Sequence, residues 1–291
     1  MSRRFIRVRP PLRQRLRPGR LPFRPRRRRG GKLRLLIGAA IALFAIVSFF
    51  GSRQYNPVTG EKQFVALAPH QEIALGLQAA PQMIRQHGGL DPGDQRQRLV
   101  DAVGMRLVER SAAARTEWQY EFHLLADTQT INAFALPGGQ CFITAALFDR
   151  LETEGQLAGV LGHEIGHVVA RHGAQKMAKS KLTQGLTGAV LVATDSAEST
   201  LLTQMIAQMV NMKYGRDDEL QSDELGVRFM ADAGYDPRAM LAVMRILAEA
   251  SSGSRPPEFF STHPNPDNRL ARIERAIGEV FPGGVPAGLE P

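Results

Sequence analysis

The uncharged segment from Leu35 to Gly51 is the feature that most constrains the fold of this chain. It reads LLIGAAIALFAIVSFFG, seventeen residues that offer a helix no polar face. A helix that crosses a bilayer needs about 17 to 25 apolar residues, so the segment is just long enough. A buried core helix and a cleaved signal peptide are the alternatives, but most core helices keep a polar side. We therefore expect one N-terminal transmembrane helix at 35–51.

The basic arm in front of this segment indicates an uncleaved signal anchor. Residues 1–34 contain fourteen arginines, one lysine and no acidic residue, far more chain than the basic region of a signal peptide. No clear Ala-x-Ala cleavage site follows. Because clustered cations stay in the cytoplasm, we expect a cytoplasmic arm and an exported body. The expected location is a bacterial inner membrane with a periplasmic body, and the mitochondrial inner membrane is the alternative.

The arm could also bind an anionic partner. Its five prolines oppose a regular helix, and only Phe5 and Phe23 could stack on nucleic-acid bases. Contacts with anionic lipids are therefore the expected role of the arm, besides setting the topology. Nucleic acid is not an expected partner.

The rest of the chain has the composition of a globular body. Acidic residues outnumber basic ones there, so the high positive charge of the whole chain belongs to the arm. The single cysteine, Cys141, excludes a disulfide framework and a cysteine-based structural zinc site. We expect a linker at 52–68, one folded domain at 69–280 and a flexible Pro/Gly-rich tail at 281–291.

Local patterns predict a mainly helical body with a small sheet. Apolar residues that recur at helical spacing alternate with Gly- and Pro-rich breaks, and two short apolar runs flank Pro137-Gly138-Gly139. The expected elements are helices at 69–87 and 94–114, a strand at 118–127, a hairpin or bent edge strand at 131–144, and helices from Ala145 to about residue 279.

The run His163-Glu164-Ile165-Gly166-His167 carries the strongest chemical signal. Thr153 and Gln156 have capping-box spacing, so a helix is expected to begin at Glu154 and to end near His172. Histidines at i and i+4 lie on one helix face and can bind one Zn²⁺. The glutamate between them would lie beside the attacking water and could act as general base.

The glycines of this helix indicate a close packing partner. Gly162 and Gly166 are weak helix formers, each costing about 1 kcal/mol relative to alanine. Their presence on the helix makes sense if another element passes close to that face. We therefore expect a close neighbour there.

A catalytic zinc also needs a third protein ligand and an open fourth position. The HExxHxxGxxH continuation of the metzincins is absent. His172 would lie about 140° further round the helix than His167, so we expect it at the surface near the helix end. Downstream, Glu219 and Asp223 share a helix face at i and i+4. One of the two could bind zinc while the other accepts the ring N–H of a ligating histidine.

Several runs follow one another in an order typical of one enzyme family. They are Asn56-Pro57-Val58-Thr59-Gly60 with Gln71-Glu72-Ile73-Ala74-Leu75-Gly76, Asn132 to Gly139, Leu161 to His167, Arg216 with Glu219 and Asp223, and Thr262-His263-Pro264. Together they resemble the membrane-associated zinc metallopeptidases of peptidase family M48, in particular its bacterial Oma-like branch. The resemblance runs from about residue 56 to 275.

The resemblance implies a site built on one zinc ion per chain. The implied metal ligands are His163, His167 and Glu219. Glu164 would be the general base, and Asp223 would orient a ligating histidine, with Arg216 in the same R-x-x-E-x-x-x-D element. His263 would either stabilise the oxyanion of the transition state or occupy the open zinc position in a resting state.

The resemblance also implies a role for the hairpin as the substrate-binding edge strand. Its residues are Asn132, Ala133, Phe134, Ala135, Leu136, Pro137, Gly138 and Gly139. An unpaired edge beside the zinc lets an extended peptide add as a strand, held by main-chain hydrogen bonds that read little sequence. The segment could instead be a core hairpin, and both interpretations hold if one edge stays open.

We therefore expect an α+β fold, namely a mainly helical zincin-like (gluzincin) metallopeptidase domain with a small β-sheet and edge hairpin, behind one transmembrane helix. A second apolar run, at 186–193, is only eight residues long and too short to span. The expected function is a membrane-anchored endopeptidase that hydrolyses unfolded or misassembled envelope proteins, with extended polypeptides and the lipid bilayer as partners. The alternative is a zinc-bound, catalytically restrained chaperone or adaptor for extended polypeptides, which would not need Glu164.

Overall fold

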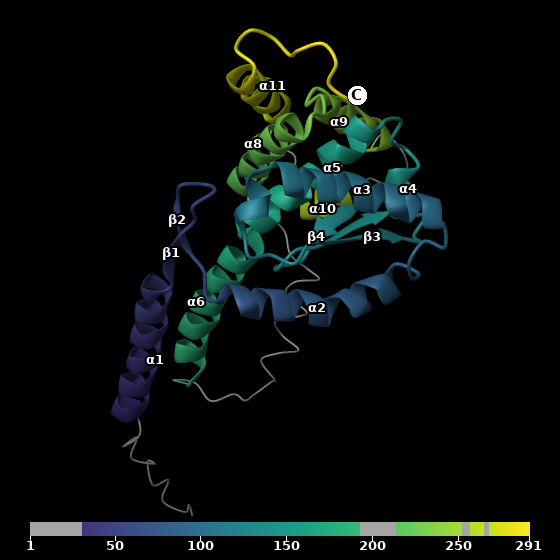
Figure 1. Ribbon diagram of the computed structural model, residues 1–291. Coiled ribbons are helices and arrows are strands. Elements are labelled where there is room, and N and C mark those ends of the chain that lie inside the picture. Colours follow the sequence, from purple (N-terminus) through teal and green to yellow (C-terminus); the bar gives the residue numbers. More distant parts are fainter. Residues whose placement is uncertain (1–30, 193–213, 252–256, 265–267) are drawn as a thin grey trace, which may run out of the picture.

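The computed structural model describes residues 31–192, 214–251, 257–264 and 268–291, and it is mainly helical (Figure 1). Most of the basic arm lies outside the described residues. The helices are α1 (Gly31–Gly51), α2 (Pro69–Gln86), α3 (Asp94–Arg110), the 3₁₀ turn η1 (Ala112–Arg115), α4 (Ala145–Phe148), α5 (Glu154–Val169), α6 (His172–Val192), α8 (Arg216–Ala233), α9 (Ala239–Ser251), α10 (Phe259–Thr262) and α11 (Arg269–Val280). The strands are β1 (Arg53–Tyr55), β2 (Lys62–Phe64), β3 (Glu121–Leu125), β4 (Ala133–Ala135) and β5 (Gln140–Thr144).

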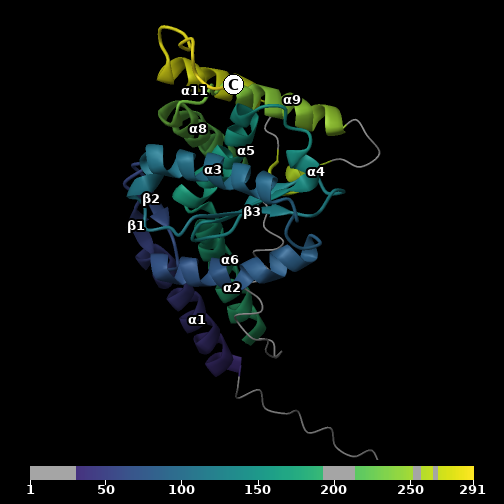
Figure 2. The same cartoon turned by 45° about the vertical axis from the view of Figure 1, so that its right-hand side comes forward.

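A three-stranded sheet forms the floor on which the site is built. Its order is β3-β5-β4, with β3 parallel and β4 antiparallel to β5, so the predicted hairpin at 131–144 is confirmed. Helix α2 covers one face of the sheet, and α3 and α5 cover the other (Figures 1 and 2). Among the described residues, no strand pairs with the outer edge of β4.

Helix α5 lies at the centre of the body. Every residue from Gly155 to Val169 is buried. The hydroxyl of Thr153 accepts a hydrogen bond from the amide of Gln156 over 3.2 Å, so the helix begins at Glu154 as predicted. A helix buried on all sides is positioned from every direction, which makes it a rigid base for functional side chains.

The glycines of α5 let α8 approach it closely. A Cβ added at Gly166 would lie 2.9 Å from the carbonyl oxygen of Ser222, and one added at Gly226 would lie 3.2 Å from the amide nitrogen of His163. Larger side chains at these positions would push the two helices apart. The close neighbour expected from the glycines is therefore α8, and the approach brings Glu219 within reach of the histidines of α5.

The end of α5 differs from the prediction. The helix stops at Val169, and Arg171 adopts a left-handed conformation with φ of 57°, after which α6 begins at His172. Arg171 donates hydrogen bonds to the buried carboxylate of Glu72 on α2 and to the carbonyl of Leu67. These bonds fix the junction between the two helices and turn the chain back toward the core.

The segment expected as a linker at 52–68 contains structure of its own. Strands β1 and β2 pair in an antiparallel hairpin. At its turn, the buried side chain of Asn56 donates a hydrogen bond of 2.8 Å to the carbonyl of Val169, at the end of α5. The hairpin is therefore joined to the body through the last turn of the central helix.

The last residues of the segment expected as a flexible tail contact the body. The carbonyl of Pro291 accepts the amide of Gly155 at the start of α5 over 2.8 Å, and Glu290 pairs with the chain beside Tyr235. The carboxylate of Glu290 also accepts a hydrogen bond from Arg106. The free amides at a helix N-terminus need acceptors, and the tail supplies one of them.

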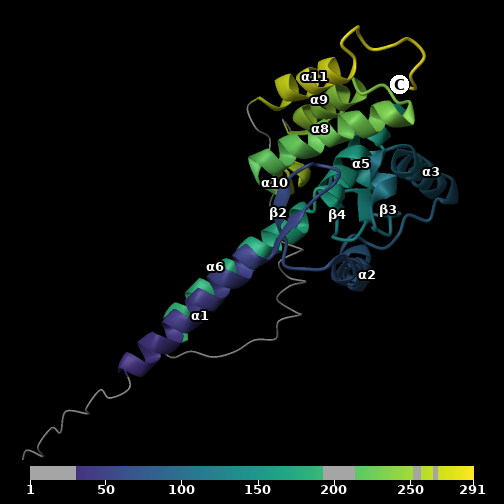
Figure 3. The ribbon, with the colours of Figure 1, turned by 60° about the vertical axis from the view of Figure 1, so that its left-hand side comes forward.

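Helix α1 projects from the body, and α6 runs beside it in the opposite direction (Figures 1 and 3). Of the described helices, only α1 is long and apolar enough to cross a membrane, over Lys32–Gly51. The segment predicted at 35–51 is therefore helical, with four additional residues at its start.

Candidate metal centre

Four buried side chains from three parts of the chain converge at one point. His163 and His167 extend from α5, Glu219 from the first turn of α8, and His263 follows α10. One donor atom from each lies within 4.8 Å of all the others. We call these residues the four-donor cluster.

The spacing of the donor atoms suits a small tetrahedral cation. Nε2 of His163 lies 3.0 Å from Nε2 of His167 and 3.3 Å from Nδ1 of His263. The carboxylate of Glu219 lies 3.4 Å from each of the two Nε2 atoms and 3.1 Å from Nδ1 of His263. Around a tetrahedral Zn²⁺ with bonds of about 2.0–2.1 Å, neighbouring donors are about 3.3 Å apart. The residues present therefore fit a zinc ion.

The protonation states and unpaired atoms of the cluster also favour a metal ion. Oε2 of Glu219 is buried and accepts no hydrogen bond among the described residues, and its nearest cation is Nη1 of Arg269 at 3.3 Å. Burial raises the pKa of Glu219, but the imidazoles of His263, His163 and His167 outweigh it and hold the pKa well below its usual range. Burial lowers the pKa of His167, so its ring is kept in the neutral form that binds metals. A carboxylate and neutral imidazoles are the donors that zinc takes in catalytic sites.

A buried ion pair fixes the first histidine. Oδ1 of Asp223 lies 2.8 Å from Nδ1 of His163, and Arg269 donates two hydrogen bonds of 2.7 and 2.9 Å to the same carboxylate. Burial raises the pKa of Asp223, but the guanidinium of Arg269 outweighs it and keeps this pKa below its ordinary value. Burial lowers the pKa of His163, but the hydrogen bonds to Asp223 and Glu219 outweigh it and raise this pKa to about 9 in the metal-free site. The ionised acceptor keeps one proton at Nδ1, and a bound metal would take the place of the proton at Nε2, which faces the cluster.

A second imidazole fixes the other histidine. Nδ1 of His172 lies 2.9 Å from Nδ1 of His167, and Nε2 of His172 lies 2.8 Å from the amide oxygen of Gln221. Because that oxygen only accepts, Nε2 of His172 carries the proton and its Nδ1 is free to accept. His167 therefore donates from Nδ1, and its Nε2 is bare toward the cluster.

Glu164 lies beside the cluster and is not one of its donors. Its side chain is fully buried, and neither carboxylate oxygen has a hydrogen-bond partner among the described residues. Oε1 lies 3.6 Å from Nε2 of His263. Burial raises the pKa of Glu164 above its ordinary value, which is the direction that suits a proton acceptor working near neutral pH.

The ring of His263 is held in place by its own helix. Its amide donates to the carbonyl of Phe259 over 2.7 Å, and the two rings stack with centroids 4.4 Å apart. In this arrangement Nδ1 takes the fourth corner of the cluster. The side chain also borders the adjoining cleft.

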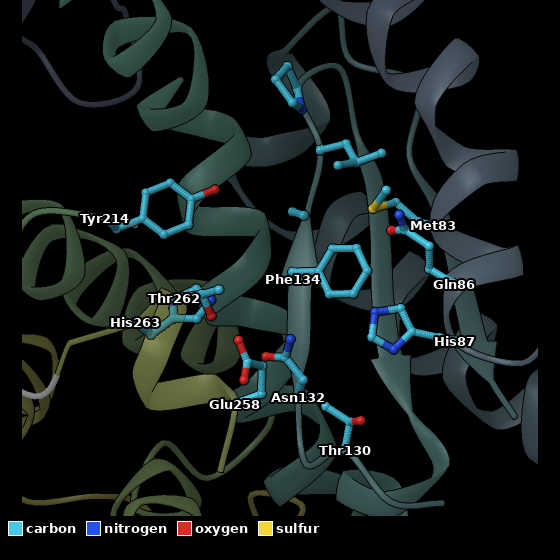
Figure 4. Close-up of a pocket in the computed structure, with 13 residues that line it drawn as sticks. Met83, Gln86, His87, Thr130, Asn132, Phe134, Tyr214, Glu258, Thr262 and His263 are labelled. Carbon is cyan, nitrogen blue, oxygen red and sulfur yellow. The ribbon is translucent and has the colours of Figure 1, made fainter. Parts of the chain in front are cut away.

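A cleft of about 340 Å³ opens beside the cluster, along β4. One wall carries Tyr214, Thr262, His263 and Glu258, and the opposite wall carries Met83, Gln86 and His87 of α2 and the loop after it (Figure 4). Phe134 of β4 extends between the walls. The ring of Tyr214 stacks on His167 at 3.8 Å, so the cleft leads directly to a metal-site histidine. An extended peptide lying along the open edge of β4 would pass the cluster.

The model of peptidase family M48 matches residues 94–277 of this chain, which include all four cluster residues. The chain belongs to peptidase family M48. The family expected from the motifs is therefore confirmed, and it is a family of metallopeptidases.

Named relatives of this M48 peptidase come from bacteria and mitochondria. The beta-barrel assembly-enhancing protease of Escherichia coli is 33% identical over 63% of this chain and 39% of its own length. The protein of that name in Yersinia pestis is 32% identical over 78% of this chain and 48% of its length. The mitochondrial metalloendopeptidase OMA1 of Schizosaccharomyces pombe is 28% identical over 87% of this chain and 74% of its length. The matched region thus spans less than half of the bacterial relatives.

The structure of the M48 peptidase brings most of the predicted site residues together. His163, His167, Glu219 and His263 meet in the cluster, and Asp223 contacts His163. Arg216 does not join them, because it is the first residue of α8 and its side chain is exposed. The expectation that His172 lies at the surface is wrong, since it is 1% exposed and contacts His167.

Two residues of the site are not predicted from the sequence. The arginine beside Asp223 is Arg269, and not Arg216 as expected. Its burial could have been predicted, because Arg269 has the helical spacing of the buried residues Ile273 and Ile277. Tyr214 covers His167, but no local pattern marks it.

Proposed function

We propose that this chain is a membrane-anchored endopeptidase that holds one Zn²⁺ through His163, His167 and Glu219 and cleaves extended polypeptides. The observation that carries the proposal is the position of Glu164, a fully buried carboxylate that has no hydrogen-bond partner in the described part of the chain and lies 3.6 Å from His263, next to the four-donor cluster. A module that only binds polypeptides has no use for such a group. The gluzincin arrangement, with a glutamate as third ligand, belongs to the same proposal.

When bound, zinc supplies Lewis acidity toward water and the scissile carbonyl. Glu164 accepts the proton of the attacking water at a carboxylate oxygen and later passes it to the leaving nitrogen. Asp223 and His172 hold protons at Nδ1 of the two ligating histidines, so that both Nε2 atoms stay available. The open edge of β4 positions the substrate backbone beside these groups.

His263 acts in this proposal as the resting occupant of the fourth corner. Its Nδ1 lies 3.3 Å from Nε2 of His163 and 3.1 Å from Glu219, where water or substrate must bind for cleavage. Substrate entry then requires the side chain to move toward the cleft that it borders. In this proposal the position of His263 corresponds to a closed form of the site.

The substrates in this proposal are unfolded or misassembled envelope proteins. Binding along a strand edge requires an extended chain, which folded proteins do not offer. The bacterial relatives bear the name beta-barrel assembly-enhancing protease, which supports misassembled proteins as the substrate class. With α1 as anchor and the basic arm in the cytoplasm, the body lies on the periplasmic face of an inner membrane, or on the corresponding face in mitochondria.

The test is casein cleavage by the full-length chain in detergent micelles, loaded with zinc. Glu164→Gln is expected to keep the zinc content and to lose cleavage by a factor of about 10² or more. Glu152→Gln, an exposed glutamate before the same helix, is the matched control and should cleave normally. Equal cleavage by Glu164→Gln and the unchanged chain would refute the general base. Zinc binding without any cleavage by the unchanged chain or by His263→Ala would favour the chaperone alternative.

A further inference from the structure

Helices α1 and α6 form an antiparallel pair that projects from the body (Figure 3). The contact is close, because a Cβ added at Gly185 of α6 would lie 2.6 Å from Cβ of Ala45 on α1. Small residues allow this kind of approach between helices inside membranes. The candidate membrane segment therefore has a partner helix in the same chain.

The exposure of α1 shows which of its sides faces α6. Its less exposed residues recur at helical spacing, namely Gly38, Ile41, Ala42, Ala45 and Phe49. The large apolar side chains point elsewhere, with Leu43 62% and Phe44 74% exposed. One side of α1 is thus covered by α6. The remaining apolar surface of α1 must be shielded from water by something else.

The charges of α6 divide the helix into two halves. Lys179 and Lys181 are exposed near the body, and no charged residue follows from Leu182 to the helix end at Val192. At a rise of 1.5 Å per residue, this uncharged half is about 16 Å long, roughly half of a 30 Å hydrocarbon core. It is long enough to enter a bilayer and too short to cross one.

The register between the helices places the charges at the membrane surface. Gly185 lies against Ala45, so Lys181, four residues nearer the body, is level with about Phe49. Phe49 is two residues from the end of the apolar segment at Gly51. The lysines of α6 therefore lie where lipid headgroups begin if α1 crosses the bilayer.

The polar residues of the uncharged half are mostly satisfied within the helix. The hydroxyl of Thr183 donates to the carbonyl of Lys179 over 3.0 Å, and that of Thr187 donates to the carbonyl of Thr183 over 2.8 Å. Hydroxyl groups bonded to their own helix can face lipid at little cost. Gln184, which is exposed, lies only three residues beyond Lys181 and within reach of the headgroups.

We propose that residues 182–192 of α6 insert beside α1 into the body-side half of the bilayer as a second membrane element. This inference rests on the proposed anchoring by α1. Lipid acyl chains would cover the exposed apolar side of the helix pair. Two helices hold the orientation of the body relative to the membrane, which one helix alone cannot do. Because α6 begins at His172, which contacts His167, residues 172–181 would hold the metal site about 15 Å from the bilayer surface, at 1.5 Å per residue.

Nitroxide labels on single cysteines test the position of α6. The chain's own Cys141 is fully buried and serves as the unlabelled background. Full-length Thr187→Cys, Leu43→Cys and Leu77→Cys are placed in nanodiscs, with Leu43 of α1 and the exposed Leu77 of α2 as references. Collisions with lipid-soluble oxygen and with a water-soluble nickel chelate are compared. Thr187 is expected to favour oxygen as Leu43 does.

Each other outcome overturns the inference in a distinct way. If Leu43 favours oxygen and Thr187 favours nickel like Leu77, α6 lies in water. If Thr187 is shielded from both reagents, protein covers it in place of lipid. If Leu43 also favours nickel, the proposed anchoring by α1 fails first.

A cross-link tests the pairing independently. Cysteines at Ala45 and Gly185 are expected to form an intramolecular disulfide in membranes, because a shift of about 1 Å gives the Cβ separation that a disulfide needs. The matched pair Ala45 and Gly188 should not cross-link, since a Cβ at Gly188 meets nothing within 4 Å. Equal cross-linking of both pairs, or of neither, would overturn the pairing.

Discussion

His172 accepts a hydrogen bond from Nδ1 of His167 across 2.9 Å, as Asp223 does from Nδ1 of His163 across 2.8 Å. The two ligating histidines are therefore oriented by different partners, one a neutral imidazole and the other a carboxylate. The imidazole is itself fixed by Gln221. The site already holds the carboxylates of Glu164, Glu219 and Asp223. A neutral imidazole fixes the direction of the hydrogen bond from His167 without adding a further negative charge that would repel them.

We predict that His172→Phe weakens zinc binding about 10- to 100-fold, because the ring N–H of His167 loses its acceptor. Gln221→Leu should weaken it less, since His172 remains but its tautomer is no longer fixed. Competition with a chromogenic chelator measures the affinity. His70→Phe, at an exposed position on α2, is the control. Unchanged affinity in a folded His172→Phe protein would contradict the role.

The buried Arg269 is predicted to stabilise the fold strongly. Arg269→Met leaves Asp223 and Glu219 without their cation, and breaking a buried pair costs about 3–5 kcal/mol. Arg272→Met is a matched control on the same helix, because its pair with Glu224 is partly exposed and should contribute about 0–1 kcal/mol. Denaturant unfolding of the zinc-free proteins gives both values. A similar loss for the two variants would argue against a special role for Arg269.

Removal of His263 is predicted to open the site. His263→Ala should keep zinc on three ligands and bind a peptide hydroxamate about tenfold more tightly, a gain of about 1.4 kcal/mol, because the fourth corner no longer holds Nδ1. Titration calorimetry measures the affinity. Thr262→Ala, a neighbour on the same wall of the cleft, should bind as the unchanged chain does. Weaker hydroxamate binding by His263→Ala would instead support a role in stabilising the transition state.

The parts of the site that lie close together in sequence could be predicted from it. The histidines of α5 share a face because they are four residues apart, and Thr153 caps the helix three residues before Gln156. The glycines indicated a close neighbour without naming it, since packing partners are set by tertiary structure. Their role at the contact with α8 appears only in the fold.

The remaining parts depend on contacts between distant residues. His172 would lie away from His167 on a continuous helix, but the left-handed turn at Arg171 swings it back. Arg269 reaches Asp223 across 46 positions, and no local period encodes that distance. The tail was expected to be flexible from its glycines and prolines, yet it supplies an acceptor to the first turn of α5.

Asp127 is predicted to stabilise the loop that leads to β4 in a manner that depends on pH. Oδ1 of Asp127 accepts the amides of Gln129 and Thr130, each over 2.9 Å, and Oδ2 lies 3.0 Å from Nδ1 of His87. Burial raises the pKa of Asp127, but the bonds from Thr130 and Gln129 and the contact with His87 outweigh it, so the pKa falls from 3.8 to about 2. Between these values the unfolded chain binds more protons than the folded one, so stability falls with the pH.

The stabilising effect of Asp127 is therefore complete above about pH 4 and is lost as the pH falls through about 2. Asp127→Asn should lower the Tm at pH 6, and the difference from the unchanged chain should shrink toward pH 2. Thermal unfolding of the full chain in detergent between pH 2 and 6 measures both. Asp101→Asn, whose carboxylate accepts a side-chain bond from Gln97, is the control. If the Tm difference for Asp127→Asn stays constant down to pH 2, the ionised carboxylate of Asp127 is not what stabilises the loop. Thr130 and His87, which border the cleft, would then be held by other contacts.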